Sequence, residues 1–137
     1  MSEVAVAAGG CLCGGTRYEL AGEPVAVALC HCGSCRRAAG APAVAWAMFP
    51  LDRFRVTRGA PSAFASSPGV ERGFCGRCGT PLTFWADFLP GLVDVTVASL
   101  DDPARFTPHM HIWESRRLPW LELADTWPRH AELPPEA

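Results

Sequence analysis

Seven cysteines in three tight clusters are the feature that most constrains this chain of 137 residues. Cys11 and Cys13 form the first cluster, residues 30–35 hold three more, and Cys75 and Cys78 form the last. An odd number leaves at least one thiol unpaired in any scheme of disulfides alone. Cysteines two residues apart on an extended chain lie about 7 Å apart, which is poor geometry for a disulfide between them. The clusters therefore favour metal-binding thiolates, with zinc as the metal.

Two alternatives to zinc remain open at this point. One is an iron–sulfur cluster, although the four-cysteine run of bacterial ferredoxins is absent, and the other is redox or disulfide chemistry. The N-terminal Met1-Ser2-Glu3-Val4 has no basic region, and Cys11 comes before a hydrophobic signal could end. We therefore expect no signal peptide and a cytoplasmic protein. In that reducing compartment, clustered thiols more often bind metals or take part in catalysis.

The spacing of the outer two clusters predicts one closed metal site. Cys75-Gly-Arg-Cys78, followed by a glycine, is typical of a zinc knuckle, which supplies two ligands. Cys11-Leu-Cys13, also followed by glycine, supplies the other two. We expect a structural zinc on Cys11, Cys13, Cys75 and Cys78 that ties the start of the chain to its middle.

The middle cluster predicts a second and different zinc site. Cys30, Cys32 and Cys35 offer three sulfurs, and no fourth thiol remains in the sequence. Three protein ligands are typical of an open zinc site with a free fourth position. The alternative is a site closed by water or by a histidine, of which the candidates are His31, His109 and His111. Both arrangements predict two zinc ions per chain.

The rest of the sequence predicts one mainly β domain. Proline and glycine interrupt it every eight to twelve residues, which indicates many short antiparallel strands. The expected strands are 16–20, 25–30, 43–49, 54–57, 63–66, 72–75, 81–85, 93–99 and 109–113. The strands at 72–75 and 81–85 form a zinc-ribbon hairpin around the knuckle. One helical turn is expected at 36–39, an acidic turn at 101–103, and a surface-hugging or frayed tail at 126–137.

Composition excludes several classes of protein. Hydrophobic residues make up 49% of the chain, which argues against disorder. A net charge of −2 argues against a nucleic-acid binder, because contacts to phosphates need a basic excess. No apolar run reaches the roughly 18 residues of a membrane span. The cations are all arginine, which weakens arguments that count arginines and leaves cysteine, histidine and tryptophan as the informative residues.

Five motifs together resemble one known family, the glutathione-dependent formaldehyde-activating enzymes, which also contains centromere protein V. The resemblance covers about residues 9–123. It rests on Gly10-Cys11-Leu12-Cys13-Gly14, Cys30-His31-Cys32-x-x-Cys35-Arg36, Gly73-Phe74-Cys75-x-x-Cys78-Gly79-Thr80-Pro81-Leu82, Ser99-Leu100-Asp101-Asp102-Pro103 and Pro108-x-x-His111-Ile112.

The resemblance implies a fold, two metal sites and an activity. The fold is a single zinc-stabilised β-tent domain. The metal sites are a structural zinc on the two outer clusters and a second zinc on Cys30, Cys32 and Cys35. The activity is that of a carbon–sulfur lyase run in reverse, which joins glutathione and formaldehyde into S-hydroxymethylglutathione.

The chemistry of an open three-thiolate site points to a small thiol as substrate. A thiol bound to such a zinc loses its proton and can attack a carbonyl. Arg36 and Arg37 could meet a substrate carboxylate, or could be solvated surface residues. Trp46 could wall a pocket, although such aromatics more often pack in a core. His111 could act as a general acid or base, or could be a structural histidine.

Three functions are therefore carried forward. The first is a zinc-dependent lyase or synthase of thiol adducts. The second is a non-catalytic module in which both zinc ions are structural and the surface recruits a protein partner. The third is a reductase of the methionine sulfoxide type, which needs a reactive cysteine outside the metal sites, and the sequence has no eighth cysteine.

Overall fold

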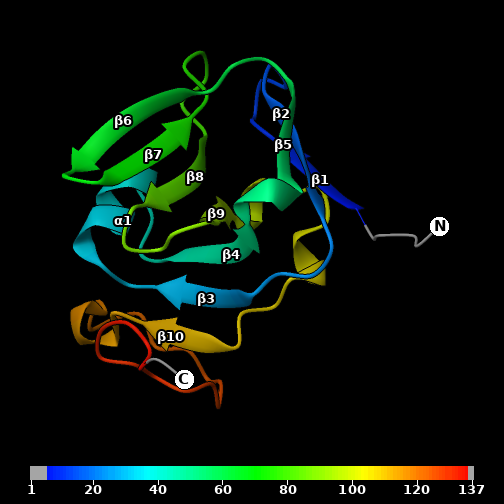
Figure 1. Ribbon diagram of the computed structural model, residues 1–137. Coiled ribbons are helices and arrows are strands. Elements are labelled where there is room, and N and C mark those ends of the chain that lie inside the picture. The colour runs from blue at the N-terminus through cyan, green and yellow to red at the C-terminus, as the bar shows by residue number, and fades with distance from the viewer. Residues whose placement is uncertain (1–5, 136–137) are drawn as a thin grey trace.

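The computed structural model describes residues 6–135 and shows a mainly β chain with one α-helix (Figure 1). The expectations for Met1–Val4 and for residues 136–137 of the tail lie outside the described residues. The single α-helix is α1 (Gly33–Ala39). The strands are β1 (Val6–Gly10), β2 (Arg17–Ala21), β3 (Ala26–Cys30), β4 (Val44–Pro50), β5 (Phe54–Arg58), β6 (Ser62–Ser67), β7 (Val70–Phe74), β8 (Pro81–Ala86), β9 (Leu92–Thr96) and β10 (Met110–Ile112). Short 3₁₀ helices are η1 (Leu51–Arg53), η2 (Val97–Ser99), η3 (Pro103–Arg105) and η4 (Glu114–Arg116).

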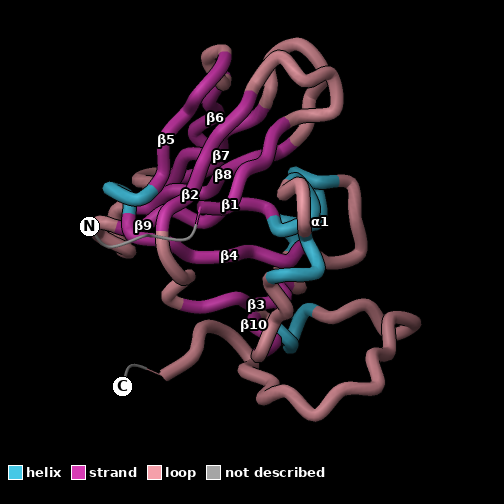
Figure 2. The backbone as a smooth tube through the Cα atoms, turned by 90° about the vertical axis from the view of Figure 1, so that its right-hand side faces the viewer, coloured by secondary structure: helices cyan, strands magenta, loops and turns pink. Residues whose placement is uncertain are grey.

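The strands form two sheets that lean against each other (Figures 1 and 2). The small sheet has the order β1-β2-β5, and the large one has the order β10-β3-β4-β9-β8-β7-β6. The predicted mainly β class is confirmed, and β7 and β8 form the expected antiparallel hairpin around the knuckle. The expectation of antiparallel strands throughout is wrong at one edge, because β10 runs parallel to β3. The chain first crosses back through η2 and η3, so β10 starts beside the start of β3 and must follow its direction.

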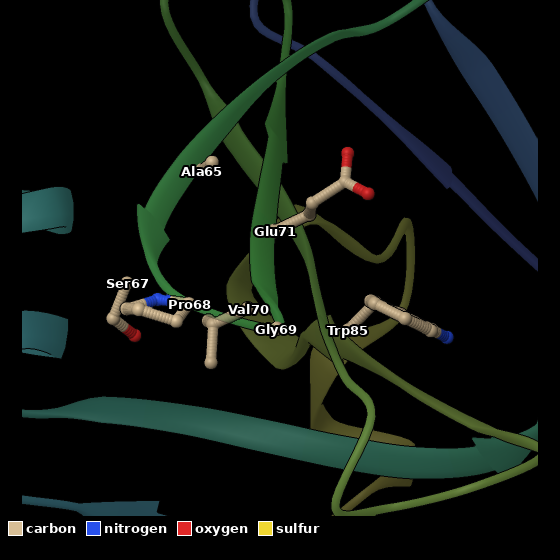
Figure 3. A pocket seen from close by; sticks show the side chains of 7 residues that line it. All are labelled: Ala65, Ser67, Pro68, Gly69, Val70, Glu71 and Trp85. Atoms are coloured by element: carbon tan, nitrogen blue, oxygen red, sulfur yellow. The ribbon is translucent and has the colours of Figure 1, made fainter.

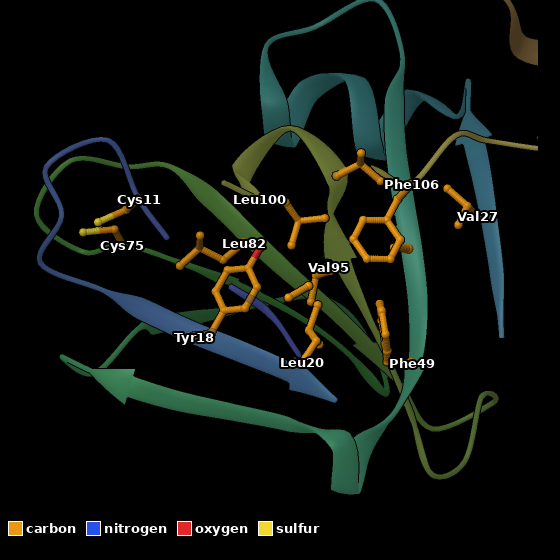
Figure 4. Packing of buried hydrophobic residues seen from close by; sticks show 13 residues of the cluster. Cys11, Tyr18, Leu20, Val27, Phe49, Cys75, Leu82, Val95, Leu100 and Phe106 are labelled. Atoms are coloured by element: carbon orange, nitrogen blue, oxygen red, sulfur yellow. The ribbon is translucent and has the colours of Figure 1, made fainter. Parts of the chain in front are cut away.

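The main core fills the space between the two sheets (Figure 4). Residues of β2 alternate between buried and partly exposed, which directs Tyr18 and Leu20 inward. Phe49 of β4 and Val95 of β9 meet them from the large sheet and are fully buried. The hydroxyl of Tyr18 lies 2.7 Å from Ser99 Oγ, so the one polar group on these four side chains has a partner.

Local signals explain where the sequence predictions differ from the structure. The strand expected at 93–99 ends at Thr96 and continues as η2, where Ser99 Oγ donates to the carbonyl of Thr96. The helix expected as one turn covers seven residues, because Cys32 caps it: the Cys35 N–H donates to Cys32 Sγ at 3.3 Å. Gly40, with a φ of 63°, ends the helix in the left-handed conformation.

The C-terminal segment lies along β10 as part of the structure (Figure 2). The His111 N–H donates to the carbonyl of Pro128, and the Trp113 N–H donates to the carbonyl of Glu132. Residues 126–135 therefore hug the surface, which is one of the two arrangements expected for the tail. Within residues 6–135, no helix has the length and apolar character that crossing a membrane requires.

Strand β1 was missed because its sequence, Val-Ala-Ala-Gly-Gly, carries no strand signal. The limited space around β1 requires small residues. A Cβ added at Gly9 would lie 2.6 Å from the Tyr18 hydroxyl and 2.7 Å from the carbonyl oxygen of Ser99. The second contact involves backbone, so it cannot be relieved by a side-chain rotation. A side chain at this position would therefore crowd the contact between β1, β2 and the backbone at Ser99.

We predict that Gly9→Ala lowers the free energy of unfolding by about 1–3 kcal/mol, the usual cost of overpacking a core. Denaturant unfolding followed by circular dichroism measures the change. The control is Ala8→Ser on the other face of β1, which should stay within about 0.5 kcal/mol of the wild type. Equal stability of Gly9→Ala and the wild type would contradict this view of β1.

Candidate metal centres and their surroundings

The outer two cysteine clusters meet at one end of the main core. Cys11 and Cys13 lie in the turn after β1, and Cys75 and Cys78 lie in the turn after β7. One sulfur from each of the four residues lies within 4.8 Å of all the others. Cys11 Sγ and Cys13 Sγ are 3.5 Å apart, and Cys13 Sγ and Cys75 Sγ are 3.8 Å apart. The structure thus brings together the four residues that the spacing paired.

Hydrogen bonds in the two turns aim these sulfurs at one point. In the first turn, the Thr16 N–H donates to Cys11 Sγ and the Gly15 N–H donates to Cys13 Sγ. In the second turn, the Arg77 and Cys78 N–H groups both donate to Cys75 Sγ. These donors favour the thiolate form, which is the form that binds metals.

Thr80 links the two turns, a role that no pattern in the sequence indicates. Its hydroxyl oxygen accepts the N–H of Leu12 from the first turn and lies 3.3 Å from Cys78 Sγ in the second. Hydrogen bonds from the side chain and backbone of Thr80 lower the pKa of Cys78 to about 5.

The donor set fits a tetrahedral zinc ion. Bonds of about 2.3 Å from zinc to sulfur place the sulfurs of a tetrahedron about 3.8 Å apart, close to the 3.5 and 3.8 Å seen here. Disulfide formation would need about 2.05 Å, and all seven cysteines are free thiols. The cluster can therefore hold a metal ion.

The three-cysteine cluster lies on the opposite face of the large sheet, where β3 ends and α1 begins. The sulfurs of Cys30, Cys32 and Cys35 lie within 4.8 Å of one another. Cys30 and Cys35 are buried and pack against Trp46 of β4. Among residues 6–135, no histidine, cysteine, aspartate or glutamate joins these three sulfurs as a fourth donor.

Hydrogen bonds among the three thiols shift the pKa values of Cys30 and Cys32 in opposite directions. Hydrogen bonds from Cys30 and Cys35 lower the pKa of Cys32 to about 2, whereas the bonds with Cys32 and Cys35 raise the pKa of Cys30. One thiolate is thus stabilised by its neighbours, which keep their protons. A metal ion is the group that would let all three sulfurs act as ligands.

The histidines that could have closed this site are engaged elsewhere. His109 Nε2 accepts the N–H of Val27. His31 Nε2 and His111 Nδ1 are 2.9 Å apart, with their rings stacked and fully buried. His111 Nε2 in turn lies 2.9 Å from a carboxylate oxygen of Asp125. His111, predicted as an acid or base, therefore has both ring nitrogens occupied.

A carboxylate and two arginines complete this buried network, which we call the histidine network: His31, His111, Glu114, Asp125, Arg117 and Arg129. Glu114 lies 3.6 Å from His31 Nε2, and the arrangement of His31, His111 and Glu114 could hold a metal ion. However, Arg117 and Arg129 already pair with Glu114. Two carboxylates and two guanidinium groups thus balance in formal charge, whereas the buried His31 Nδ1 has no hydrogen-bond partner among the described residues.

Trp113 joins the histidine network to the three-cysteine cluster. It is the one residue other than glycine with a positive φ, 53°, in the described part of the chain. This costly conformation lets Trp113 pack against the cysteine cluster while the next residue, Glu114, faces the two histidines.

Arg72 of β7 is the charged neighbour that the sequence did not reveal. Its Nη1 lies 3.7 Å from Cys35 Sγ, and its guanidinium group lies 4.9 Å from the centre of the Phe84 ring. Phe84 also contacts Trp46, with ring centres 5.9 Å apart. Trp46 thus lies beside the cysteines, whereas Arg36 lies on α1 with a buried Nε that has no partner among the described residues.

Asp94 is a second charged residue on this face that sequence reasoning missed. It lies opposite Phe84 and Met48 on neighbouring strands, and residues in such positions share a face of the sheet. Burial raises the pKa of Asp94 to about 7. A single aspartate in an alternating strand gives no signal in the sequence that it will be partly buried.

We predict that the stability of the Asp94→Asn variant relative to the wild type increases as pH rises. The unfolded chain releases this proton near pH 4, whereas the folded chain keeps it to about pH 7. The free energy of unfolding of the wild type therefore falls as pH rises between those two values. Asparagine does not titrate, so the variant does not lose this stability.

The measurement is the difference in melting temperature between Asp94→Asn and the wild type at pH 5 and pH 8. Any effect of acid on the cysteines is common to both proteins and cancels. The difference should be more positive at pH 8, and equal differences at the two pH values would contradict the prediction.

A hollow on the described surface lies at the turn between β6 and β7 (Figure 3). It has a volume of about 410 Å³ and is lined by Ala65, Ser67, Pro68, Gly69, Val70, Glu71 and Trp85. No cysteine contributes to it. Glu71 and Trp85 are paired across β7 and β8 one position away from Arg72 and Phe84, so they face the other side of the sheet.

Loss of a ligand from the four-cysteine site is expected to prevent folding, because metal binding there can contribute as much free energy as the whole domain has. Structural zinc sites contribute about 10–16 kcal/mol of apparent binding free energy in small peptides, and whole domains are stable by only about 5–15 kcal/mol. We predict that Cys78→Ala gives unfolded or insoluble protein, which expression yield and a thermal melt measure. A cooperative transition within a few degrees of the wild type would contradict a structural role.

Comparisons with known proteins agree with this arrangement. The family model described as "Glutathione-dependent formaldehyde-activating enzyme" matches residues 6–116. A crystal structure of a protein from Rhodobacter sphaeroides is similar, with a TM-score of 0.59 and 28% sequence identity over 69% of this chain and 87% of that chain. No curated protein matches the chain.

Proposed function

The chain belongs to the glutathione-dependent formaldehyde-activating enzyme family, and we propose that it is a zinc-dependent carbon–sulfur lyase or synthase. Its substrate would be an adduct of a small thiol and an aldehyde, of the S-hydroxymethylglutathione type. One observation carries the proposal: three sulfurs converge beside the large sheet, and no fourth protein ligand joins them among the described residues. The fourth position would therefore belong to the substrate thiol.

The metal would supply one property to this site. A zinc ion held by Cys30, Cys32 and Cys35 favours the thiolate form of a thiol bound to it, which makes that sulfur a nucleophile toward an aldehyde carbon. In the reverse direction, the same preference makes the sulfur a good leaving group. A second zinc on Cys11, Cys13, Cys75 and Cys78 would be structural. Free thiols in both clusters fit a reducing compartment such as the cytoplasm.

The chain's own residues would position the substrate and limit the access of water. Trp46 and Phe84 form an aromatic wall beside Cys30 and Cys35. The burial of these cysteines makes electrostatic interactions at the site stronger than in water. His111 would act through His31, because its ring nitrogens already contact His31 and Asp125. This supports a positioning role for His111 over direct proton transfer.

A non-catalytic binding module is the second candidate. The observation that favours it is the position of two hollows on the described surface, since neither of them is lined by a cysteine. If both zinc ions were structural, the fourth position of the second one would not exchange with a thiol. The experiment that follows separates the two functions.

We predict that cobalt-substituted protein binds glutathione at the three-cysteine site. A fourth sulfur changes the coordination sphere, so the cobalt–thiolate absorption bands of the wild type should shift on titration. Cys35→Ala should stay folded, because its site joins residues only five apart and contributes little long-range closure. It should lose the shift and keep the bands of the four-cysteine site.

The matched control is Ser34→Ala, an exposed residue in the same turn, which should keep the wild-type shift. Metal analysis should give about two zinc ions per wild-type chain and about one for Cys35→Ala. If no small thiol shifts the bands of the wild type, the second site is closed and the binding module replaces the enzyme.

A further inference from the structure

We propose that Arg72 is the residue that recognises an anionic group of the substrate, so that the site prefers thiols carrying a carboxylate near the sulfur. The inference rests on the proposed function, because it assigns the substrate class of the same three-cysteine site. The sequence offered Arg36 and Arg37 for this role, with solvated surface residues as the alternative.

The position of Arg72 brings a positive charge to the sulfurs. Its Nη1 lies 3.7 Å from Cys35 Sγ, although the two residues are 37 positions apart in the chain. A ligand held by the three cysteines would therefore lie within reach of the guanidinium group.

The guanidinium group is held in place but keeps donors free. Nε donates to Ser66 Oγ at 3.2 Å, and the group lies over the Phe84 ring. Stacking on Phe84 orients the planar fork without using its N–H groups. Among residues 6–135, Nη2 donates to no side chain and is open to solvent.

No protein carboxylate competes for this charge. Among the described residues, none lies within 4 Å of the Arg72 nitrogens, whereas Arg17, Arg55, Arg117 and Arg129 all pair with acidic side chains. An arginine beside a binding site without an acidic partner is suited to a ligand carboxylate, which it can bind through two parallel hydrogen bonds.

Arg36 and Arg37 on α1 are the other candidates for binding a substrate carboxylate, and neither has a described contact with a cysteine sulfur. Arg37 is exposed and makes no hydrogen bond to a cysteine sulfur in the described part of the chain. Arg36 has its Nη2 directed toward Gly33, 3.7 Å from where a Cβ there would lie. Arg72 is thus the arginine with a described contact to the cluster.

The test compares two thiols of similar size on cobalt-substituted protein. One is 3-mercaptopropionate, which carries a carboxylate, and the other is 2-mercaptoethanol, which is neutral. The variants are Arg72→Met, which removes the charge, and Arg72→Lys, which keeps it. Arg36→Met and Arg37→Met are the matched controls. Comparing the ratio of the two dissociation constants between each variant and the wild type cancels intrinsic differences between the thiols.

We expect Arg72→Met to weaken binding of 3-mercaptopropionate about tenfold, equivalent to about 1.4 kcal/mol, and binding of 2-mercaptoethanol less than twofold. Arg72→Lys should keep part of the preference, and both control variants should keep all of it. The bands of the four-cysteine site report that each variant is folded.

Three results would overturn the inference. Equal weakening of both thiols by Arg72→Met would mean that Arg72 only balances the charge of the sulfurs. Loss of the preference in Arg36→Met alone would assign recognition to α1. Equal affinity of the wild type for both thiols would remove the preference itself. In all three cases the thiol still binds, so the proposed function survives; the absence of any shift in the wild type would overturn both.

Discussion

The contact between the turn after β1 and the turn after β7 is the constraint on which the rest of the structure depends. It is the place where the small sheet and the large sheet meet, and Cys11 and Cys75 lie at the end of the same core that contains Tyr18 and Leu82 (Figure 4). The contact joins residues more than 60 positions apart, so closing it costs much chain entropy. A metal ion on the four converging sulfurs would offset that cost at one point. It would hold the end of the hydrophobic core that lies between the two sheets.

The second cluster is held by different means, because it has no long-range sulfur of its own. His31 lies between two of its cysteines in the sequence, and its ring is bonded to His111 of β10. Asp125 then fixes His111 from the C-terminal segment. The histidine network therefore anchors the backbone of the cysteine turn from behind, while the three sulfurs face the other way. This arrangement leaves the ligand positions free and explains why the C-terminal segment is bonded to β10 rather than frayed.

The sequence predicted well those features that local spacing determines. The cysteine clusters, the knuckle hairpin and most strands follow from residue types within a few positions of one another. What it missed depends on partners far along the chain. Gly9 belongs to a strand because of Tyr18 and Ser99, β10 is parallel because of a crossover, and Arg72 meets Cys35 only through the pairing of β7, β8 and β9 and the packing of α1. Arg36 adjoins Cys35 in sequence, yet it is Arg72 that has the described contact with that sulfur.

The two clusters differ in the kind of hydrogen-bond donor that contacts their sulfurs. In the four-cysteine cluster, backbone N–H groups of residues 15, 16, 77 and 78 donate to the sulfurs. Such donors are fixed by the turns and cannot leave, so they stabilise one permanent arrangement of charge. At the three-cysteine cluster, the charged donor is the side chain of Arg72. A guanidinium group stacked on Phe84 can share its charge between a sulfur and a ligand. Fixed dipoles suit a structural centre, and a shareable cation suits a centre whose total charge changes when a substrate arrives.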